Sequence, residues 1–183
     1  MQFIKTDIQD LVLIKPTVFG DERGYFLESF NQDKFREQVG DVNFIQVNES
    51  KSSFGVLRGL HYQKPPYTQA KLVRCIQGKV LDVVVDLRKD SPTYGQHLSF
   101  ELSGENKHQL FVPRGMAHGF VVLSETAIFS YMVDNKYAPD YDSGIAWNDP
   151  QLNIDWQLPR EQLILSAKDQ LLKPMAETEI PCF

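Results

Sequence analysis

The segment Arg58-Gly59-Leu60-His61-Tyr62-Gln63 places an imidazole, a guanidinium, a phenol and a glycine within six residues. His61 is one of only four histidines in the chain, and its flanks have the composition of a strand. An imidazole titrates near neutral pH, so it can take up or release a proton under physiological conditions. A strand histidine can also simply satisfy a hydrogen bond, and the residues that accompany His61 decide between these roles.

A second histidine, His118, follows Pro113 and Gly115 in the pattern Pro-x-Gly-x-x-His between two predicted strands. This pattern matches the later half of the cupin signature, whose metal-binding forms add an earlier His-x-His pair and a glutamate. Here Gln63 stands where the second histidine of that pair would be. Zinc and iron usually take three protein ligands, and only His61 and His118 are suitable imidazoles, so we expect no bound metal.

Two histidines near a lysine suit the removal of a proton next to a carbonyl group. Histidine would be the base, and the enolate oxygen that forms needs a hydrogen-bond donor or a positive charge in a dry cavity. Lys71 opens a predicted strand and could supply that charge, or it could be a solvated lysine at the rim. Tyr131 could return a proton from the opposite face, as inversion of a stereocentre requires, or it could be a core aromatic.

The spacing of Arg58 and His61 adds a condition. Residues three apart in a flat strand point to opposite faces of the sheet. A bulge at Gly59 would turn both side chains toward one cavity, and otherwise they serve different surfaces.

The elements that must position these residues are mostly strands. Residues 43–133 read as one strand after another, and residues 97–102 alternate cleanly between apolar and polar. Glycines recur at about the spacing of an all-β sandwich or barrel. We therefore predict a mainly β, cupin-type jelly roll over residues 1–183, forming one domain with a few short peripheral helices.

The segments outside that core have their own signals. The turn predicted at residues 19–24 separates an apolar, β-rich segment from a strand at residues 25–30. Residues 31–40 predict a helix with Asn31 as its cap and Gly40 at its exit, and residues 160–172 predict short helical turns on the outside.

The strand predicted at residues 79–87 carries aspartates on one of its two faces. Asp82 and Asp86 alternate with apolar residues, whereas the other face is wholly apolar. This pattern fits either a partly polar interior, as in a barrel with a cavity, or a solvated outer face.

Composition sets the broad class of protein. A length of 183 residues, 42% hydrophobic content and a net charge of −5 are typical of a soluble globular protein and argue against nucleic-acid binding. The first residues lack the pattern of a signal peptide, no apolar run could span a membrane, and Cys75 and Cys182 suggest no disulfide framework. We expect a cytoplasmic protein that binds neither nucleic acid nor membrane.

Further motifs give a specific resemblance. Together with the segments around His61 and His118, the motifs at residues 21–28, 46–48 and 147–150 resemble the dTDP-4-dehydrorhamnose 3,5-epimerase family. They follow the family's order from residue 8 to about residue 172. The resemblance implies a homodimeric jelly roll without metal or other cofactor. The substrate would be dTDP-4-dehydro-6-deoxy-D-glucose, epimerised at C3 and C5 to the precursor of dTDP-L-rhamnose.

The resemblance also assigns roles to residues. His61 would be the general base, paired with Asp169, Tyr131 would be the general acid, and Lys71 would stabilise the enolate. Arg23 would reach across the dimer, and Asp142 stands where the family usually has a glutamate. The residues implied in substrate binding are Arg23, Glu28, Gln46, Asn48, Arg58, Lys71, His118, Asp142 and Lys168.

Three other readings remain open from the residues. The chain could be an epimerase acting at one carbon only or a ketoisomerase on the same scaffold. It could also be a cupin that binds a nucleotide sugar without catalysis, although a pure binder needs neither a base nor an acid. A metal-dependent oxygenase is disfavoured by Gln63.

Overall fold

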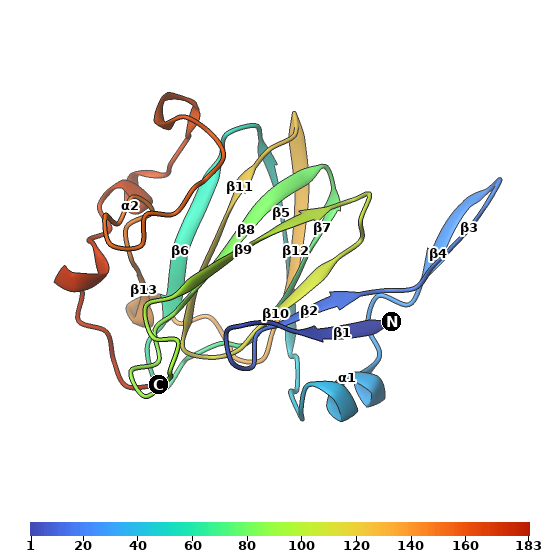
Figure 1. Ribbon diagram of the computed structural model, residues 1–183, viewed down its shortest axis with the longest axis horizontal. Helices are drawn as coiled ribbons and strands as arrows, with labels where there is room; N and C mark the ends of the chain where they lie inside the picture. Colours follow the sequence, from blue (N-terminus) through green and yellow to red (C-terminus); the bar gives the residue numbers. More distant parts are fainter.

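The computed structural model describes residues 1–183 as two antiparallel sheets packed face to face (Figure 1). This arrangement confirms the predicted mainly β sandwich. The six-stranded sheet has the order β1 (Gln2–Lys5), β2 (Val12–Lys15), β10 (Gln109–Val112), β7 (Lys71–Gln77), β12 (Thr126–Val133) and β5 (Gln46–Ser53). The five-stranded sheet has the order β13 (Asp142–Gly144), β6 (Leu57–Gln63), β11 (Met116–Val122), β8 (Lys79–Asp86) and β9 (His97–Ser103).

Strand β8 of the five-stranded sheet is buried on both faces. One face of β8 packs into the core between the sheets through Val80 and Val84, and the other packs beneath the C-terminal segment through Leu81 and Val83. Asp82 shares the face that points between the sheets, and it is fully buried. The partly polar interior is therefore confirmed, and the solvated outer face is wrong.

The second aspartate of β8 has a structural role at the end of that strand. Asp86 is also fully buried, and its carboxylate accepts hydrogen bonds from Arg88, Ser91 and Thr93. A buried carboxylate with this many donors keeps its charge at little cost. These bonds hold the loop that follows β8.

The N-terminal part forms a hairpin that projects away from the sandwich (Figure 1). It consists of β3 (Val18–Asp21) and β4 (Gly24–Leu27), with Phe19 opposite Phe26. The predicted turn over residues 19–24 was too long, because the Asp21 carboxylate accepts from the Arg23 backbone N–H at 2.9 Å and closes the chain within Asp21–Gly24.

The helices are short and peripheral, as predicted. In α1 (Gln32–Gln38) the Asn31 side chain accepts from the Lys34 N–H, and Phe35 is buried. The other helical segments are η1 (Pro139–Tyr141), η2 (Arg160–Gln162), α2 (Ala167–Gln170) and η3 (Met175–Glu177). The C-terminal segment with α2 lies beside β6 on the outside of the sandwich (Figure 1). No helix is both long and apolar enough to cross a bilayer.

Candidate active site

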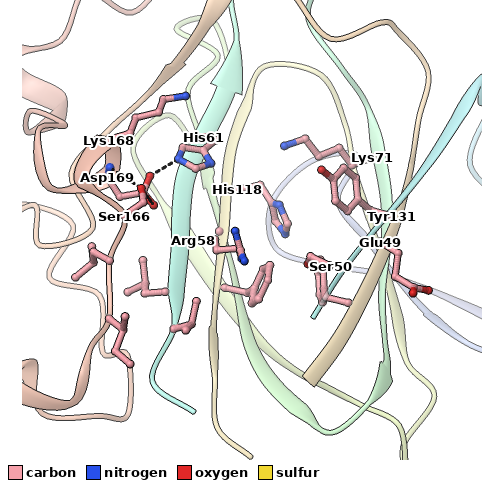
Figure 2. A pocket seen from close by; sticks show the side chains of 17 residues that line it. Glu49, Ser50, Arg58, His61, Lys71, His118, Tyr131, Ser166, Lys168 and Asp169 are labelled. Atoms are coloured by element: carbon pink, nitrogen blue, oxygen red, sulfur yellow. Dashed lines mark hydrogen bonds and ion pairs between the residues drawn. The ribbon is translucent and has the colours of Figure 1, made fainter. Parts of the chain in front are cut away.

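A cavity of ≈ 460 Å³ opens between the two sheets. Its polar lining comes from both sheets and from the segment around α2 (Figure 2). The polar residues around it are Glu49, Ser50, Arg58, His61, Lys71, His118, Tyr131, Ser166, Lys168 and Asp169. A cleft in which polar groups from several elements converge is the usual form of a small-molecule site.

On the five-stranded sheet, His61 is paired with Asp169. The His61 Nε2 lies 2.5 Å from the Asp169 Oδ1, and the Asp169 side chain is only 4% exposed. Burial alone would raise the pKa of Asp169, but hydrogen bonds from His61 and Ser166 bring it below its ordinary value. An ionised carboxylate only accepts, so Nε2 of a neutral His61 carries the proton and Nδ1 keeps a lone pair. Figure 2 shows the ring between Asp169 and the cavity.

A second His–Asp pair lies beside the first. His118 on β11 is the direct cross-strand partner of His61, and its Nε2 lies 2.8 and 3.0 Å from the two carboxylate oxygens of Asp82. Burial raises the pKa of Asp82, although the charges of His118 and Lys71 oppose that rise. Asp82 therefore fixes the His118 ring at the floor of the cavity.

On the opposite sheet, Lys71 and Tyr131 face the cavity from the adjacent strands β7 and β12 (Figure 2). Burial lowers the pKa of Lys71 to about 8, while the carboxylates of Asp142 and Asp82 act to raise it. Burial raises the pKa of Tyr131, so its phenol stays protonated at neutral pH. The two sheets thus present an imidazole on one side and a protonated phenol with a buried lysine on the other.

Of the two alternatives left open for Gly59, the structure has the bulge. Gly59 has φ +129°, and the pairing of β6 with β11 shifts register between His118 and Phe120. A Cβ at Gly59 would lie 2.5 Å from the Gly119 Cα, so only glycine fits. The irregularity brings Arg58 and His61 to the same cavity.

A second, more polar chamber of ≈ 500 Å³ adjoins the first and shares His61, Lys71 and Tyr131 with it. Asp142 lines this chamber, where it forms an ion pair with Lys168 and accepts from the Tyr137 hydroxyl at 3.0 Å. The other residues of this chamber include Gln46, Asn48, Gln63 and Gln69. Gln63 braces the surrounding loops, because its amide bonds the backbones of Tyr67, Lys136 and Ala138.

Two of the predicted substrate-binding residues lie outside both chambers. Arg23 is at the tip of the projecting hairpin, where its side chain is 84% exposed and pairs with Asp21. Glu28 follows that hairpin and pairs with Lys34 at 2.7 Å. Neither side chain contributes to the cavity of its own chain.

Sequence reasoning missed two residues that position the His–Asp pairs of the site. Asp82 was noticed as a polar residue in an apolar strand, but its partner was not identified. Ser166 hydrogen-bonds the Asp169 carboxylate at 2.9 Å, and its only signal is its position three residues before Asp169, which is typical of a helix cap. No group of three or more His, Cys, Asp or Glu side chains is arranged to hold a metal ion.

The fold is that of a cupin-type sandwich, with a polar cavity between its two sheets. The family model described as dTDP-4-dehydrorhamnose 3,5-epimerase matches residues 5–177. The chain therefore belongs to the dTDP-4-dehydrorhamnose 3,5-epimerase family, and it is an epimerase of that class.

Individual members of this family are similar to this chain over nearly its whole length. The chain is 55% identical over 170 residues to the dTDP-4-dehydrorhamnose 3,5-epimerase of Shigella flexneri, covering 92% of this chain and 93% of that one. It is 50% identical to that of Pseudomonas aeruginosa, covering 100% and 99%. The Legionella pneumophila enzyme, solved in complex with dTDP-4-keto-L-rhamnose, has a TM-score of 0.95 and 46% identity, covering 100% and 98%.

Proposed function

We propose that this cavity converts dTDP-4-dehydro-6-deoxy-D-glucose into dTDP-4-dehydro-L-rhamnose by inverting C3 and C5, in the biosynthesis of dTDP-L-rhamnose. One observation carries the proposal. His61 on one sheet, paired with Asp169 of α2, faces Tyr131 and Lys71 on the other sheet across a single cavity. A base and an acid on opposite sides of a bound sugar are what inversion at carbon requires.

The chemistry follows from the ketone at C4. C3 and C5 both neighbour this carbonyl, so removing a proton from either carbon sends the electron pair to the C4 oxygen as an enolate. His61 accepts the proton, and Asp169 stabilises the imidazolium that results. Lys71 carries the positive charge that stabilises the enolate oxygen. Tyr131 then donates its phenolic proton to the opposite face of the same carbon. Tyr131 regains a proton from solvent and His61 releases its own to solvent, so both groups are restored for the next inversion. No cofactor is required.

The remaining polar residues suit a nucleoside diphosphate. Arg58 and Lys168 provide positive charge at the cavity, and a planar guanidinium can bond two phosphate oxygens at once. His118 is placed to contact the sugar. Gln46, Asn48 and Asp142 line the second chamber, which we assign to the nucleotide.

Replacing Tyr131 with phenylalanine is expected to separate proton removal from inversion. Net epimerisation should fall by about 10²-fold, because the donor on the far face is lost while the base remains. Exchange of substrate protons with D2O should fall by less, since His61 can return the proton to the face it came from. The two rates are compared by NMR on one sample. Equal loss of both rates would contradict this role for Tyr131.

We further propose a homodimer in which the hairpin β3–β4 reaches the partner's cavity. The hairpin projects from the sandwich, and its aromatic side chains are exposed, with Phe19 at 63% and Phe26 at 69%. Exposed apolar side chains gathered on one projecting element are typical of an interface. Arg23 at the tip would then add its charge to the partner's substrate site.

Mixed dimers test whether Arg23 of one chain serves the cavity of the partner chain. The variants Arg23→Ala and His61→Ala should each be impaired as homodimers, Arg23→Ala mainly through a raised KM for the charged substrate. A heterodimer of the two restores one complete site only if Arg23 serves the partner's cavity. Co-expression with two affinity tags isolates that heterodimer. Activity no higher than the sum of the two homodimers would reject the exchange.

The proposed function itself is tested by turnover. The purified, chelator-treated protein is incubated with dTDP-4-dehydro-6-deoxy-D-glucose, and the configuration of the product is read by NMR. Inversion at C3 and C5 supports the proposal. Inversion at one carbon would assign the narrower epimerase, and an unchanged substrate would reject the reaction.

A further inference from the structure

Both oxygens of the Asp169 carboxylate have a partner. Oδ1 faces His61 Nε2 at 2.5 Å, and Oδ2 accepts from the Ser166 hydroxyl at 2.9 Å. The same Ser166 oxygen accepts from the Asp169 backbone N–H at 3.1 Å. The hydroxyl therefore bonds Asp169 at the backbone and at the side chain simultaneously.

The position of Ser166 is fixed to the strand that carries His61. The residues before it run beside the start of β6, where Ile164 N donates to Gly55 O at 2.8 Å and Leu57 N donates to Ile164 O at 2.9 Å. Val56 and Ile164 form a parallel bridge at the same place. Hydrogen bonds therefore connect Ser166 to the strand of His61 in two ways. One runs through the backbone pairing at Ile164, and the other runs through the Asp169 carboxylate.

We infer that Ser166 is a positioning residue for epimerisation, whose hydroxyl holds the Asp169 carboxylate in the orientation that meets His61 Nε2. The inference rests on the proposed role of His61 as the base. Without the hydroxyl, Oδ2 has no donor in the protein although the side chain is only 4% exposed. The carboxylate then rotates or takes up water, and the imidazole loses its fixed tautomer.

The helix-capping role of Ser166 can be separated from its bond to the carboxylate. Threonine at this position keeps both the cap and the hydroxyl. Glycine is nearly as good a cap as serine but has no hydroxyl, and alanine is a poor cap that also lacks one. The three variants Ser166→Thr, Ser166→Gly and Ser166→Ala therefore form a graded set.

A matched control lies outside the cavity. The Ser91 hydroxyl donates to the buried Asp86 carboxylate at 2.7 Å, so Ser91→Ala removes the same kind of bond from another buried carboxylate. This variant should lose stability and keep the kcat and the pH profile of the wild type.

Steady-state kinetics over a range of pH tests the inference. Ser166→Gly and Ser166→Ala should both lose kcat by about tenfold, the low end of what a misaligned general base costs, with little change in KM. The acidic limb of kcat/KM should move to lower pH, because an imidazolium that the carboxylate no longer meets is less stable and releases its proton more readily. Ser166→Thr should restore both quantities.

Other outcomes would overturn the inference. If Ser166→Gly keeps the wild-type kcat and the wild-type acidic limb, Ser166 acts only as a helix cap. Equal losses of kcat in Ser166→Gly and Ser91→Ala would indicate general destabilisation. Retained activity in His61→Ala would instead reject the base itself, so the two failures are distinguishable.

Discussion

Replacing His61 with alanine is expected to lower the rate of epimerisation by about 10³-fold, within the range that general-base catalysis contributes. The loss should apply to C3 and C5 alike, because His61 is the more exposed of the two histidines that line the cavity, with 31% of its side chain exposed. His118 is not expected to take over, since its side chain is only 7% exposed. Initial rates of the purified variant measure the effect.

The control for this variant is another histidine outside the cavity. His97 lies at the start of β9 and is partly exposed, so His97→Ala should leave the rate unchanged. Circular dichroism should show the same fold for both variants. A His61→Ala enzyme that keeps more than about a tenth of the wild-type rate would assign the base to another group.

Replacing Lys71 with methionine is expected to lower kcat by about 10²-fold to 10³-fold, as does the loss of one stabilising group for an oxyanion. Methionine preserves most of the length and apolar stem of the side chain but removes the charge at the enolate oxygen. Substrate binding should suffer less, because Arg58 and Lys168 remain. Separate measurement of kcat and KM checks this division. A change confined to KM would make Lys71 a binding residue only.

The same lysine predicts an alkaline limit to the reaction. Burial lowers the pKa of Lys71 to about 8, so its ammonium is present below that pH and is lost above it. The value of kcat/KM should therefore fall as the pH rises through about 8. Lys71→Met should be slow at every pH and lack this limb. An unchanged alkaline limb in Lys71→Met would assign the titration to a different group.

The local features of the fold followed directly from the sequence. The Asn31 cap, the bulge at Gly59 and the polar face of the strand with Asp82 each depend on a few adjacent residues, and each is present in the structure. Capping and bulging are decided by short-range sterics and hydrogen bonds, so a sequence window contains the necessary information.

The pairs that build the site depend on long-range register. His61 and Asp169 are 108 residues apart and His118 and Asp82 are 36 apart, so neither pair could be read from spacing. The first pair came from the family resemblance alone, and the second was missed. Register between distant strands is set by the packing of the whole sandwich, which local patterns do not specify.

The contacts of Asp142 could not be read from the sequence. Asp142 stands where the family usually has a glutamate, and the shorter acid keeps the charge. In the structure, β13 pairs with β6 and brings Asp142 opposite Gln63, where its carboxylate bonds Lys168 and Tyr137. Its role as a substrate contact remains a proposal.

Deuterium exchange tests the central claim that one cavity removes protons from both carbons. The wild type and His61→Ala are incubated with the 4-keto sugar nucleotide in D2O, and the isotope at C3 and C5 is read by NMR. The account predicts deuterium at both carbons with the wild type and at neither carbon, beyond the uncatalysed level, with His61→Ala. Exchange at either carbon in the variant at the wild-type rate would contradict it.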